Sequence, residues 1–457
     1  MSKNAVRDLT QGSPMKLILG FMLPLLFGMV FQQFYNMVDT IIVGQFLGIN
    51  DLAGVGSTGS INFLVIGFVI GVSAGFAIPV AQKFGSKDFD ELKKYVGNTI
   101  WITIIFAAVL TTATCLLCSK ILEWMNTPKE VFAPARDYIF VIFLGIPVTF
   151  LYNILSGFIR SLGDSKTPVV FLIISSLLNI ALDIFMIVVL GMGVAGAGWA
   201  TVISQLVSGI LCLVFIGKRF ELLRISRDDL KLRPYYIGRL CAVGLPMGLQ
   251  YSITAIGSIL LQAAVNGLGS VAIAAVTAGN KVGQFMCCPL DAMGSTMATY
   301  GGQNVGAGKL DRLKHGLFDC IILGVIWSLI ALAISFFFGD SLSALFINKN
   351  DPETAKNAAE IIRLSKQFLV YTAMFYIPLA FVNIVRFLIQ GMGYSQIALY
   401  AGVFELVARG AVALCFVPVF GYDAVCFASP AAWILADCFL VPTFFACFRA
   451  TKRKLGQ

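Results

Sequence analysis

The chain contains a succession of apolar runs, each long enough to cross a lipid bilayer as a helix. Examples are the segments "TIIFAAVLTTATCLLC", "IISSLLNIALDIFMIVVLG" and "CIILGVIWSLIALAISFFFG". A membrane-spanning helix needs about 20 predominantly apolar residues. Because 58% of the 457 residues are hydrophobic and only 12% are charged, a water-soluble fold of this length could not bury so much apolar surface. We therefore predict an all-α integral membrane protein.

The distribution of Lys and Arg predicts how the chain crosses the membrane. Basic residues concentrate in alternate connecting segments, such as Lys83–Lys94 and 218–239. By the positive-inside rule, these segments and both termini lie in the cytoplasm. The same bias accounts for the net charge of +9 without a nucleic-acid partner. The first span has no cleavage pattern of a signal peptide, so we expect it to be retained. Hydropathy predicts twelve spans, centred near residues 28, 68, 106, 145, 179, 206, 251, 286, 327, 373, 407 and 436.

The second half of the chain repeats the first. At an offset of 221 residues "AQKFGSKDFDELKK" aligns with "GQNVGAGKLDRLKH", and at 230 residues "NILSGFIRSLGDS" aligns with "NIVRFLIQGMGYS". The longer offset fits an extended outside loop, "GDSLSALFINKNDPETAK", before the tenth span. Six spans are an even number, so both copies enter the membrane from the same side, as in parallel-repeat transporters. We predict two six-helix lobes, 1–225 with a cation site and 226–457, related by a pseudo-twofold axis around a central cavity.

Several short motifs have enzymatic or metal-binding interpretations that their context does not support. "GVSAG" (71–75) matches the nucleophile pattern of hydrolases but lies within a span, without a nearby His. "GVGSTG" (54–59) and "GMGVAG" (191–196) match a dinucleotide fingerprint but follow no soluble strand. Cys115 and Cys118 have zinc-ligand spacing but lack a second pair. We expect close packing and tight turns at the glycines, and apolar packing at the cysteines.

Carboxylates inside apolar spans carry more information, because burying a charge in lipid costs about 2.5–3.5 kcal/mol on insertion scales. Asp39 lies in the first span and Asp183 in the fifth. Tyr35 precedes Asp39 by one helical turn, and Asn179 precedes Asp183 in the same way, so each pair shares a helix face. Convergence of these faces would form an oxygen-rich site for a monovalent cation or a proton-sharing carboxylate pair. Alternatively, each polar group is satisfied separately by its own backbone. The predicted cation site comprises Asp39, Asp183, Asn179 and Thr201, with Tyr35 and Asn153 in support.

The second half does not keep these acids. The repeat aligns Asp183 with Ala413 and Asn179 with Arg409. Glu405 precedes Arg409 by one turn, which also fits a purely structural ion pair, and no role is predicted for Asp437. We predict that the substrate cavity, where a cationic substrate would meet acidic and aromatic side chains, is lined by Asp291, Glu405, Tyr152 and Tyr251.

The sequence resembles the multidrug and toxic compound extrusion (MATE) family, in its MepA-like and DinF-like bacterial branch. The resemblance covers nearly the whole chain and rests on "LPLLFGMVFQQFYNMVDTIIVGQFLG", "RSLGDSKTP" and "GGQNVGAGK". It implies cation-coupled drug export from two six-helix lobes in a bacterial cell membrane, with a helix bend at Pro24. The NorM-like branch carries an acid on span 7, whereas "GLPMGLQYSITAIGSILL" has none. The family's first-lobe cation site matches Asp39, Asn179, Asp183 and Thr201.

These observations predict a secondary antiporter that exports lipophilic, mainly cationic compounds in exchange for H⁺, which we favour, or Na⁺. We expect no cofactor and a monomer in the bilayer. A lipid-linked flippase of the same superfamily is one alternative, but it would need a basic cavity, and only Lys281, Arg386 and Arg409 are available within the spans. A membrane enzyme is a second alternative, without a recognisable nucleophile and base. The sequence does not identify the physiological substrate.

Overall fold

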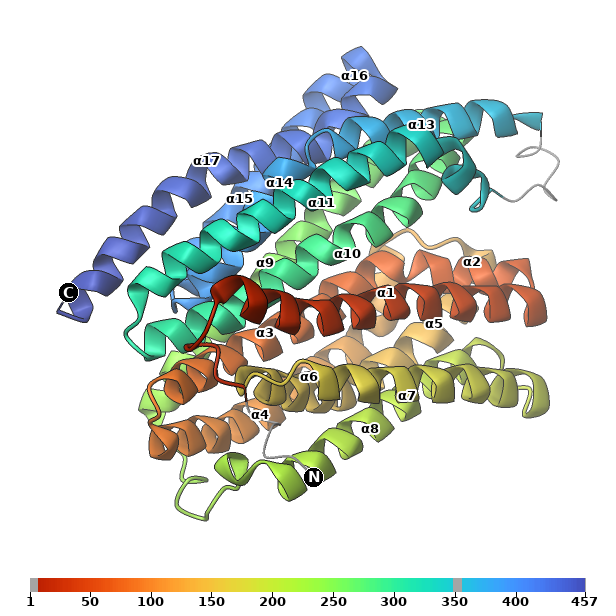
Figure 1. The fold of residues 1–457 in the computed structure, drawn as a ribbon. Helices are drawn as coiled ribbons and strands as arrows, with labels where there is room; N and C mark the ends of the chain where they lie inside the picture. The colour runs from red at the N-terminus through yellow and green to blue at the C-terminus, as the bar shows by residue number, and fades with distance from the viewer. Residues whose placement is uncertain (1–6, 348–355, 457) are drawn as a thin grey trace. The chain divides into compact units, whose positions relative to one another are not determined.

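The computed structural model describes residues 7–347 and 356–456. Every regular element in these ranges is a helix (Figure 1). The predicted outside loop before the tenth span falls partly on residues 348–355, which lie outside the described residues. The predicted all-α fold is thus confirmed for the described part of the chain.

In the described ranges, ten helical segments are long and apolar enough to cross a bilayer. They are α1 (Pro14–Phe46), α3 (Gly59–Gly85), α4 (Phe89–Trp124), α7 with η1 (Lys166–Val189), α8 (Gly193–Arg219), α9 (Pro234–Asn266), α10 (Ser270–Gly306), α11 (Leu310–Ala344), α15 to α16 (Ser395–Phe420) and α17 (Tyr422–Lys454). Two further pairs qualify together, namely α5 (Lys129–Leu144) with α6 (Ile146–Ser161) and α13 (Ala358–Ala373) with α14 (Tyr376–Gly391). If each pair is one span, the total is twelve.

The two broken spans fall at corresponding places in the sequence repeat. The helices bend by 47° between α5 and α6, and by 51° between α13 and α14. A proline follows each break, Pro147 in the first turn of α6 and Pro378 in the first turn of α14. Proline is well tolerated in the first turn of a helix, where its missing N–H needs no intrahelical partner, so each span can restart there. The π-helices η1 (Phe185–Val189) and η3 (Val412–Phe416) also occupy similar places in the two halves.

The chain divides into two compact units. Unit 1 comprises Leu23–Ser252 with the short segments Met1–Gln11 and Gly302–Gly308, and unit 2 comprises the rest. Unit 1 also contains two short helices that the sequence did not predict, α2 (Ile49–Ser57), which packs against α5, and η2 (Glu221–Leu223). The lobe limits predicted from the repeat, 1–225 and 226–457, remain a prediction.

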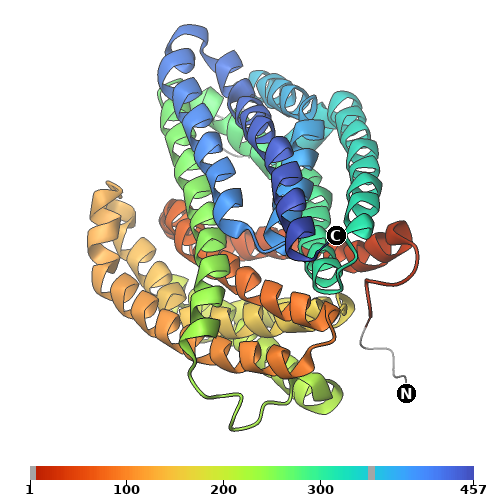
Figure 2. The ribbon, with the colours of Figure 1, turned by 90° about the vertical axis from the view of Figure 1, so that its left-hand side faces the viewer.

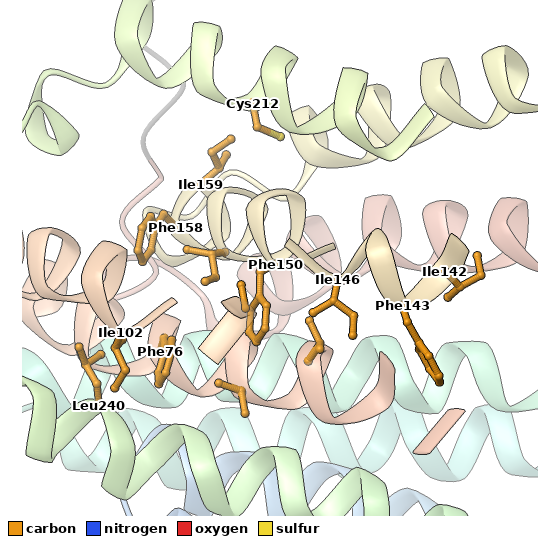
Figure 3. Close-up of a cluster of buried hydrophobic side chains, with 14 of the residues drawn as sticks. Phe76, Ile102, Ile142, Phe143, Ile146, Phe150, Phe158, Ile159, Cys212 and Leu240 are labelled. Carbon is orange, nitrogen blue, oxygen red and sulfur yellow. The ribbon is translucent and has the colours of Figure 1, made fainter. Parts of the chain in front are cut away.

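The core of unit 1 forms where α3 packs against α6 (Figure 3). Phe76 of α3, Phe143 of α5 and Phe150 of α6 are completely buried. Within a membrane, helix association depends on close packing rather than on removal from water, and the "GVSAG" segment provides it. A Cβ on Gly71 would lie 2.5 Å from the Met247 carbonyl oxygen, where α9 passes α3. The glycines of this motif therefore serve packing, as the membrane context predicts.

The repeated Gln-x-x-Gly segments pack against each other reciprocally in unit 1. A Cβ on Gly85, at the end of α3, would lie 1.9 Å from the Gln303 carbonyl oxygen. A Cβ on Gly306, at the end of α10, would lie 1.8 Å from the Gln82 carbonyl oxygen. Each glycine thus lets its helix end approach the backbone of the repeat-related segment. Leu9 is held at the same place, because its N–H donates to Gln303 Oε1 at 2.9 Å.

We expect Gly85→Ala to destabilise the protein. The added methyl would meet a backbone carbonyl, which cannot rotate away as a side chain can, and overpacking of this kind costs about 1–3 kcal/mol. Gly238→Ala is the matched control, because Gly238 is helical in α9 and an added Cβ there meets nothing within 4 Å. Thermal unfolding in detergent should show a lower Tm for Gly85→Ala alone. Equal Tm values for the two variants would contradict the reciprocal packing.

Candidate cation site

Helices α1 and α7 each present two polar side chains one turn apart in unit 1. Tyr35 and Asp39 lie on α1, and Asn179 and Asp183 lie on α7. Asn179 is 1% exposed and Asp183 is 0% exposed. Asp183 stands in the last turn of α7, directly before the π-helix η1. π-Helical turns frequently occur at functional sites.

The Asn179 amide joins α7 to α8. With both ends of the amide satisfied, its nitrogen donates to Asp183 Oδ2 at 2.9 Å and its oxygen accepts from the Thr201 backbone N–H at 3.1 Å. The amide also lies 3.4 Å from the Thr201 hydroxyl, and that hydroxyl donates to the Ala197 carbonyl at 3.1 Å. Three of the four predicted cation-site residues are therefore connected by hydrogen bonds.

The fourth, Asp39, lies beside Asp183. The two carboxyl groups are within hydrogen-bonding reach of each other. Oδ1 of each is buried and has no hydrogen-bond partner among the described residues. No ion pair in the described ranges includes either carboxylate. Two adjacent anions in an apolar interior repel each other and lose hydration, so this pair requires a bound proton or another cation.

Two tyrosines complete the cluster. The Tyr35 hydroxyl is within hydrogen-bonding reach of Thr201 and close to both carboxylates. Tyr138 on α5 is 8% exposed and lies near Asp39, Asp183 and Tyr35. Tyr138 was not predicted from the sequence, because no polar residue lies one turn away from it on α5. Only the packing of α5 brings it to the site.

The other unit 1 residues of the predicted sites have other contacts. Asn153 on α6 donates to the carbonyl of Thr149 at 2.8 Å, within its own helix. The Tyr152 hydroxyl lies 3.4 Å from the Pro168 carbonyl oxygen of α7. The Tyr251 side chain packs beside Gly67 of α3. Pro24 lies inside α1, and the helix bend expected there stays a prediction.

The predicted acids of the second half lie in two different settings of unit 2. Asp291 on α10 is exposed, and its Oδ1 accepts from Asn383 Nδ2 at 3.1 Å. Glu405 on α15 is 3% exposed and forms ion pairs with Arg386 and Arg409. The structure therefore presents Asp291 to its surroundings and holds Glu405 inside an ion-pair cluster.

The donor atoms of the unit 1 cluster determine which ion it fits. Carboxylate, amide and hydroxyl oxygens are the ligands that hard cations bind. The Asn179 oxygen and the Thr201 hydroxyl already have partners, whereas the two carboxylate Oδ1 atoms have none among the described residues. A proton needs only a carboxylate oxygen, so the cluster fits a proton as it is arranged. It fits Na⁺ if Asn179 and Thr201 redirect their oxygens.

A comparison with protein families agrees with this architecture. The family model described as MatE matches residues 24–185 and 246–414, which is more than half of the chain. The chain belongs to the MATE family. The resemblance that the sequence motifs carry is thereby confirmed.

Individual MATE relatives match over most of the chain. It is 31% identical over 340 residues to the "Probable multidrug resistance protein YoeA" of Bacillus subtilis (strain 168), covering 72% of this chain and 73% of that protein. It is 27% identical over 387 residues to the "Probable multidrug resistance protein YpnP" of the same organism, covering 83% of this chain and 82% of that protein. A solved structure described as the outward-facing conformation of a multidrug resistance MATE family transporter superposes with a TM-score of 0.90 at 22% identity, covering 99% of each chain.

Membership of the MATE family settles the broad class of the protein. The chain is a multi-pass membrane transporter of a multidrug efflux family, and it is not an enzyme. Its helices have the fold of the two-lobed MATE transporters. Family membership alone does not specify the coupling ion, the substrate or the residues that bind them.

Proposed function

We propose that this MATE chain is a secondary antiporter that exports lipophilic, mainly cationic compounds and takes up H⁺ at Asp39 and Asp183 in exchange. One observation carries the proposal: two neighbouring carboxylates lie in membrane-spanning helices, and among the described residues each has a buried oxygen without a hydrogen-bond partner and neither forms an ion pair with a basic side chain. Such a pair shares one exchangeable proton. The expected setting is a bacterial cell membrane, with both termini in the cytoplasm and the transporter acting as a monomer.

Coupling requires the proton to bind two states of the transporter with different affinity. Asp39 is on α1, and Pro24 lies about four turns earlier in the same helix. Proline removes a backbone donor inside the helix and permits bending there. Protonation of Asp39 removes the repulsion between α1 and α7 at Asp183. We therefore assign bending of α1 as the conformational change that is coupled to proton binding. Proton uptake favours the state that releases substrate outward.

Acidic and aromatic side chains within the spans support a cationic substrate. Asp291 is an exposed carboxylate in a membrane-spanning helix, and it accepts a hydrogen bond from the neutral Asn383 amide. Aromatic side chains such as Tyr152 and Tyr251 attract cations through their ring faces. The substrate-lining role of these residues is part of the proposal.

The proposal is tested by transport in vesicles with separately imposed gradients. Purified protein is reconstituted, the membrane potential is held at zero with valinomycin and equal K⁺, and uptake of tetraphenylphosphonium is measured. An inside-acid pH gradient without Na⁺ should drive uptake. An inside-high Na⁺ gradient at equal pH should not. Uptake that follows the Na⁺ gradient at clamped pH would overturn the choice of H⁺.

Asn179→Ala and Thr201→Val separate the two ions further. For H⁺ coupling, Asn179→Ala removes a donor to the ionised Asp183 carboxylate, so proton-driven uptake should persist with its pH dependence moved to higher pH. Thr201→Val should change uptake little, because the Asn179 oxygen accepts from the backbone N–H of residue 201. For Na⁺ coupling, each change would instead remove a ligand oxygen and weaken Na⁺-driven uptake strongly. The measurement is the pH and Na⁺ dependence of initial uptake rates.

A further inference from the structure

Unit 2 contains a buried cluster of ionisable side chains from three helices. Arg386 lies on α14, Glu405 and Arg409 lie on α15, and Asp437 lies on α17. Arg386, Glu405 and Arg409 are 4%, 3% and 7% exposed, and Asp437 is half-buried. We call these four residues the charge cluster of unit 2.

Glu405 holds the two arginines together. Arg386 Nη2 bonds to Glu405 Oε1, and Arg409 Nη2 lies 3.7 Å from Glu405 Oε2. Asp437 is close enough to Arg386 and Glu405 for both charges to act on it. Arg386 Nε, Arg409 Nη1 and Asp437 Oδ1 are buried without a hydrogen-bond partner among the described residues. The cluster is therefore incompletely bonded, although its members are close together.

The net charge of the cluster depends on Asp437. With Asp437 ionised, the two guanidinium groups and the two carboxylates cancel. With Asp437 protonated, one positive charge remains uncompensated inside the unit, which is costly in an apolar medium. Arg386 therefore favours the ionised carboxylate, whereas the burial of Oδ1 without a donor favours the protonated one. Opposed effects of this kind allow a carboxyl group to exchange its proton.

No other charge in the described ranges acts on Asp437. Helix α17 packs against α13, α14, α15, α16 and η3, and α16 and η3 contain no charged residue. On α13, Lys366 is paired with Asp340, and Arg363 lies 3.9 Å from Glu360. Helices α14 and α15 supply the charge cluster itself. Besides its own burial, Asp437 therefore responds to the charges of Arg386 and Glu405.

The repeat indicates why unit 2 would use a carboxylate on a different helix. Arg409 occupies the position that Asn179 holds in the first half, and Ala413 occupies that of Asp183. The second half thus carries a permanent guanidinium charge where the first half has its cation cluster. The Arg409 side chain lies against α9 at Gly257, where an added Cβ would be 3.5 Å from Arg409 Nη1. Within the charge cluster, Asp437 is the residue whose carboxylate has an oxygen without a hydrogen-bond partner among the described residues.

Helix α17 contains two prolines that make it easier to bend around Asp437. The C-terminal helix α17 is drawn in dark blue in Figure 2. Pro430 and Pro442 lie inside it, on either side of Asp437 in the sequence. Each proline removes a backbone hydrogen bond and makes bending easier. Proton uptake by Asp437 removes the attraction between α17 and Arg386 of α14. The change in charge therefore acts on the contact between α14 and a bendable helix.

We infer that Asp437 is a second proton-binding site, in which Arg386 and Glu405 set the charge and a second proton is exchanged in each transport cycle. The inference rests on the proposed H⁺ antiport, because a second coupled proton has meaning only if the first is coupled. It assigns one exchangeable proton to each unit of the chain.

The number of coupled protons is measured by the steady-state accumulation of tetraphenylphosphonium in the vesicles described above. At zero membrane potential each coupled proton contributes about tenfold accumulation per pH unit of gradient, so two protons give about hundredfold. We expect about hundredfold for the wild type and about tenfold for Asp437→Asn. Asp423→Asn is the matched control, because Asp423 is exposed on the same helix and bonds to Gln367. It should accumulate like the wild type.

The outcomes separate the two proposals. Wild-type accumulation of about tenfold, or an unchanged hundredfold value in Asp437→Asn, would overturn the second site and leave H⁺ antiport intact. No pH-driven accumulation in the wild type would overturn the antiport itself. If Asp437→Asn does not fold, Asp437→Ser is the smaller non-ionisable substitute, and the wild-type value alone still decides whether a second proton is coupled.

Discussion

Asp39→Asn and Asp183→Asn are each expected to abolish pH-driven uptake of tetraphenylphosphonium while leaving the protein folded. Asparagine has the shape of aspartate but cannot ionise, so one partner of the carboxylate pair can no longer exchange a proton. The remaining carboxylate then has a neutral neighbour, so the two side chains no longer repel each other. Proton uptake can therefore no longer change the contact between α1 and α7. Uptake in each variant should fall at least about tenfold, since removal of a group that acts in coupling affects the rate by more than ordinary surface substitutions do.

Controls distinguish loss of coupling from loss of structure. Asp51→Asn changes an acid in the first turn of α2, within the same unit, and should retain wild-type uptake. Retention time on a sizing column and Tm in detergent should match the wild type for all three variants. Normal pH-driven uptake by a folded Asp39→Asn or Asp183→Asn variant would remove the proposed proton site.

Hydropathy and local spacing predicted much of the fold. Every predicted span centre falls within a long apolar helix or at the bend of a broken pair, because membrane-spanning helices must satisfy their backbone internally and therefore have a strong local signature. The bends were not predicted. Gly145 lies at the first one, in the middle of what reads as a continuous apolar run. Hydropathy does not sense a change in helix direction.

Only contacts between residues on the same helix could be predicted for the site from local spacing. The pairs Tyr35 with Asp39 and Asn179 with Asp183 follow from the i,i+4 spacing of a helix. That α1 and α7 bring both pairs together came from the family resemblance and is a tertiary property. Tyr138 was missed for the same reason, since nothing in its own segment distinguishes it from an apolar packing residue.

The second half illustrates the same limit. The spacing of Glu405 and Arg409 predicted their ion pair, which the structure contains at 3.7 Å. The partners from other helices, Arg386 and Asp437, have no spacing relation to Glu405 along the chain. Whether Glu405 also contacts a cationic substrate remains a prediction, and its environment permits a direct test.

Glu405→Gln is expected to destabilise the protein by about 3–5 kcal/mol, the range found when one member of a buried ion pair is removed. The amide cannot neutralise Arg386 or Arg409, which are 4% and 7% exposed, so unit 2 would retain buried positive charge. Glu360→Gln makes the same chemical change at an exposed pair, where the side chains are 57% and 73% exposed. Exposed pairs contribute about 0–1 kcal/mol, so this control should unfold like the wild type.

Thermal and denaturant unfolding in detergent measure the difference between these two variants. Adding Arg386→Gln to Glu405→Gln should recover part of the loss, because it removes one of the two uncompensated guanidinium groups, and coupled neighbours are not additive. A Glu405→Gln protein as stable as Glu360→Gln would contradict the structural role of the charge cluster. If that stable protein also transported a different range of cations, Glu405 would instead contact the substrate. If Glu405→Gln causes a large loss of stability and Arg386→Gln partly restores it, the role of Glu405 is to hold α14 and α15 together.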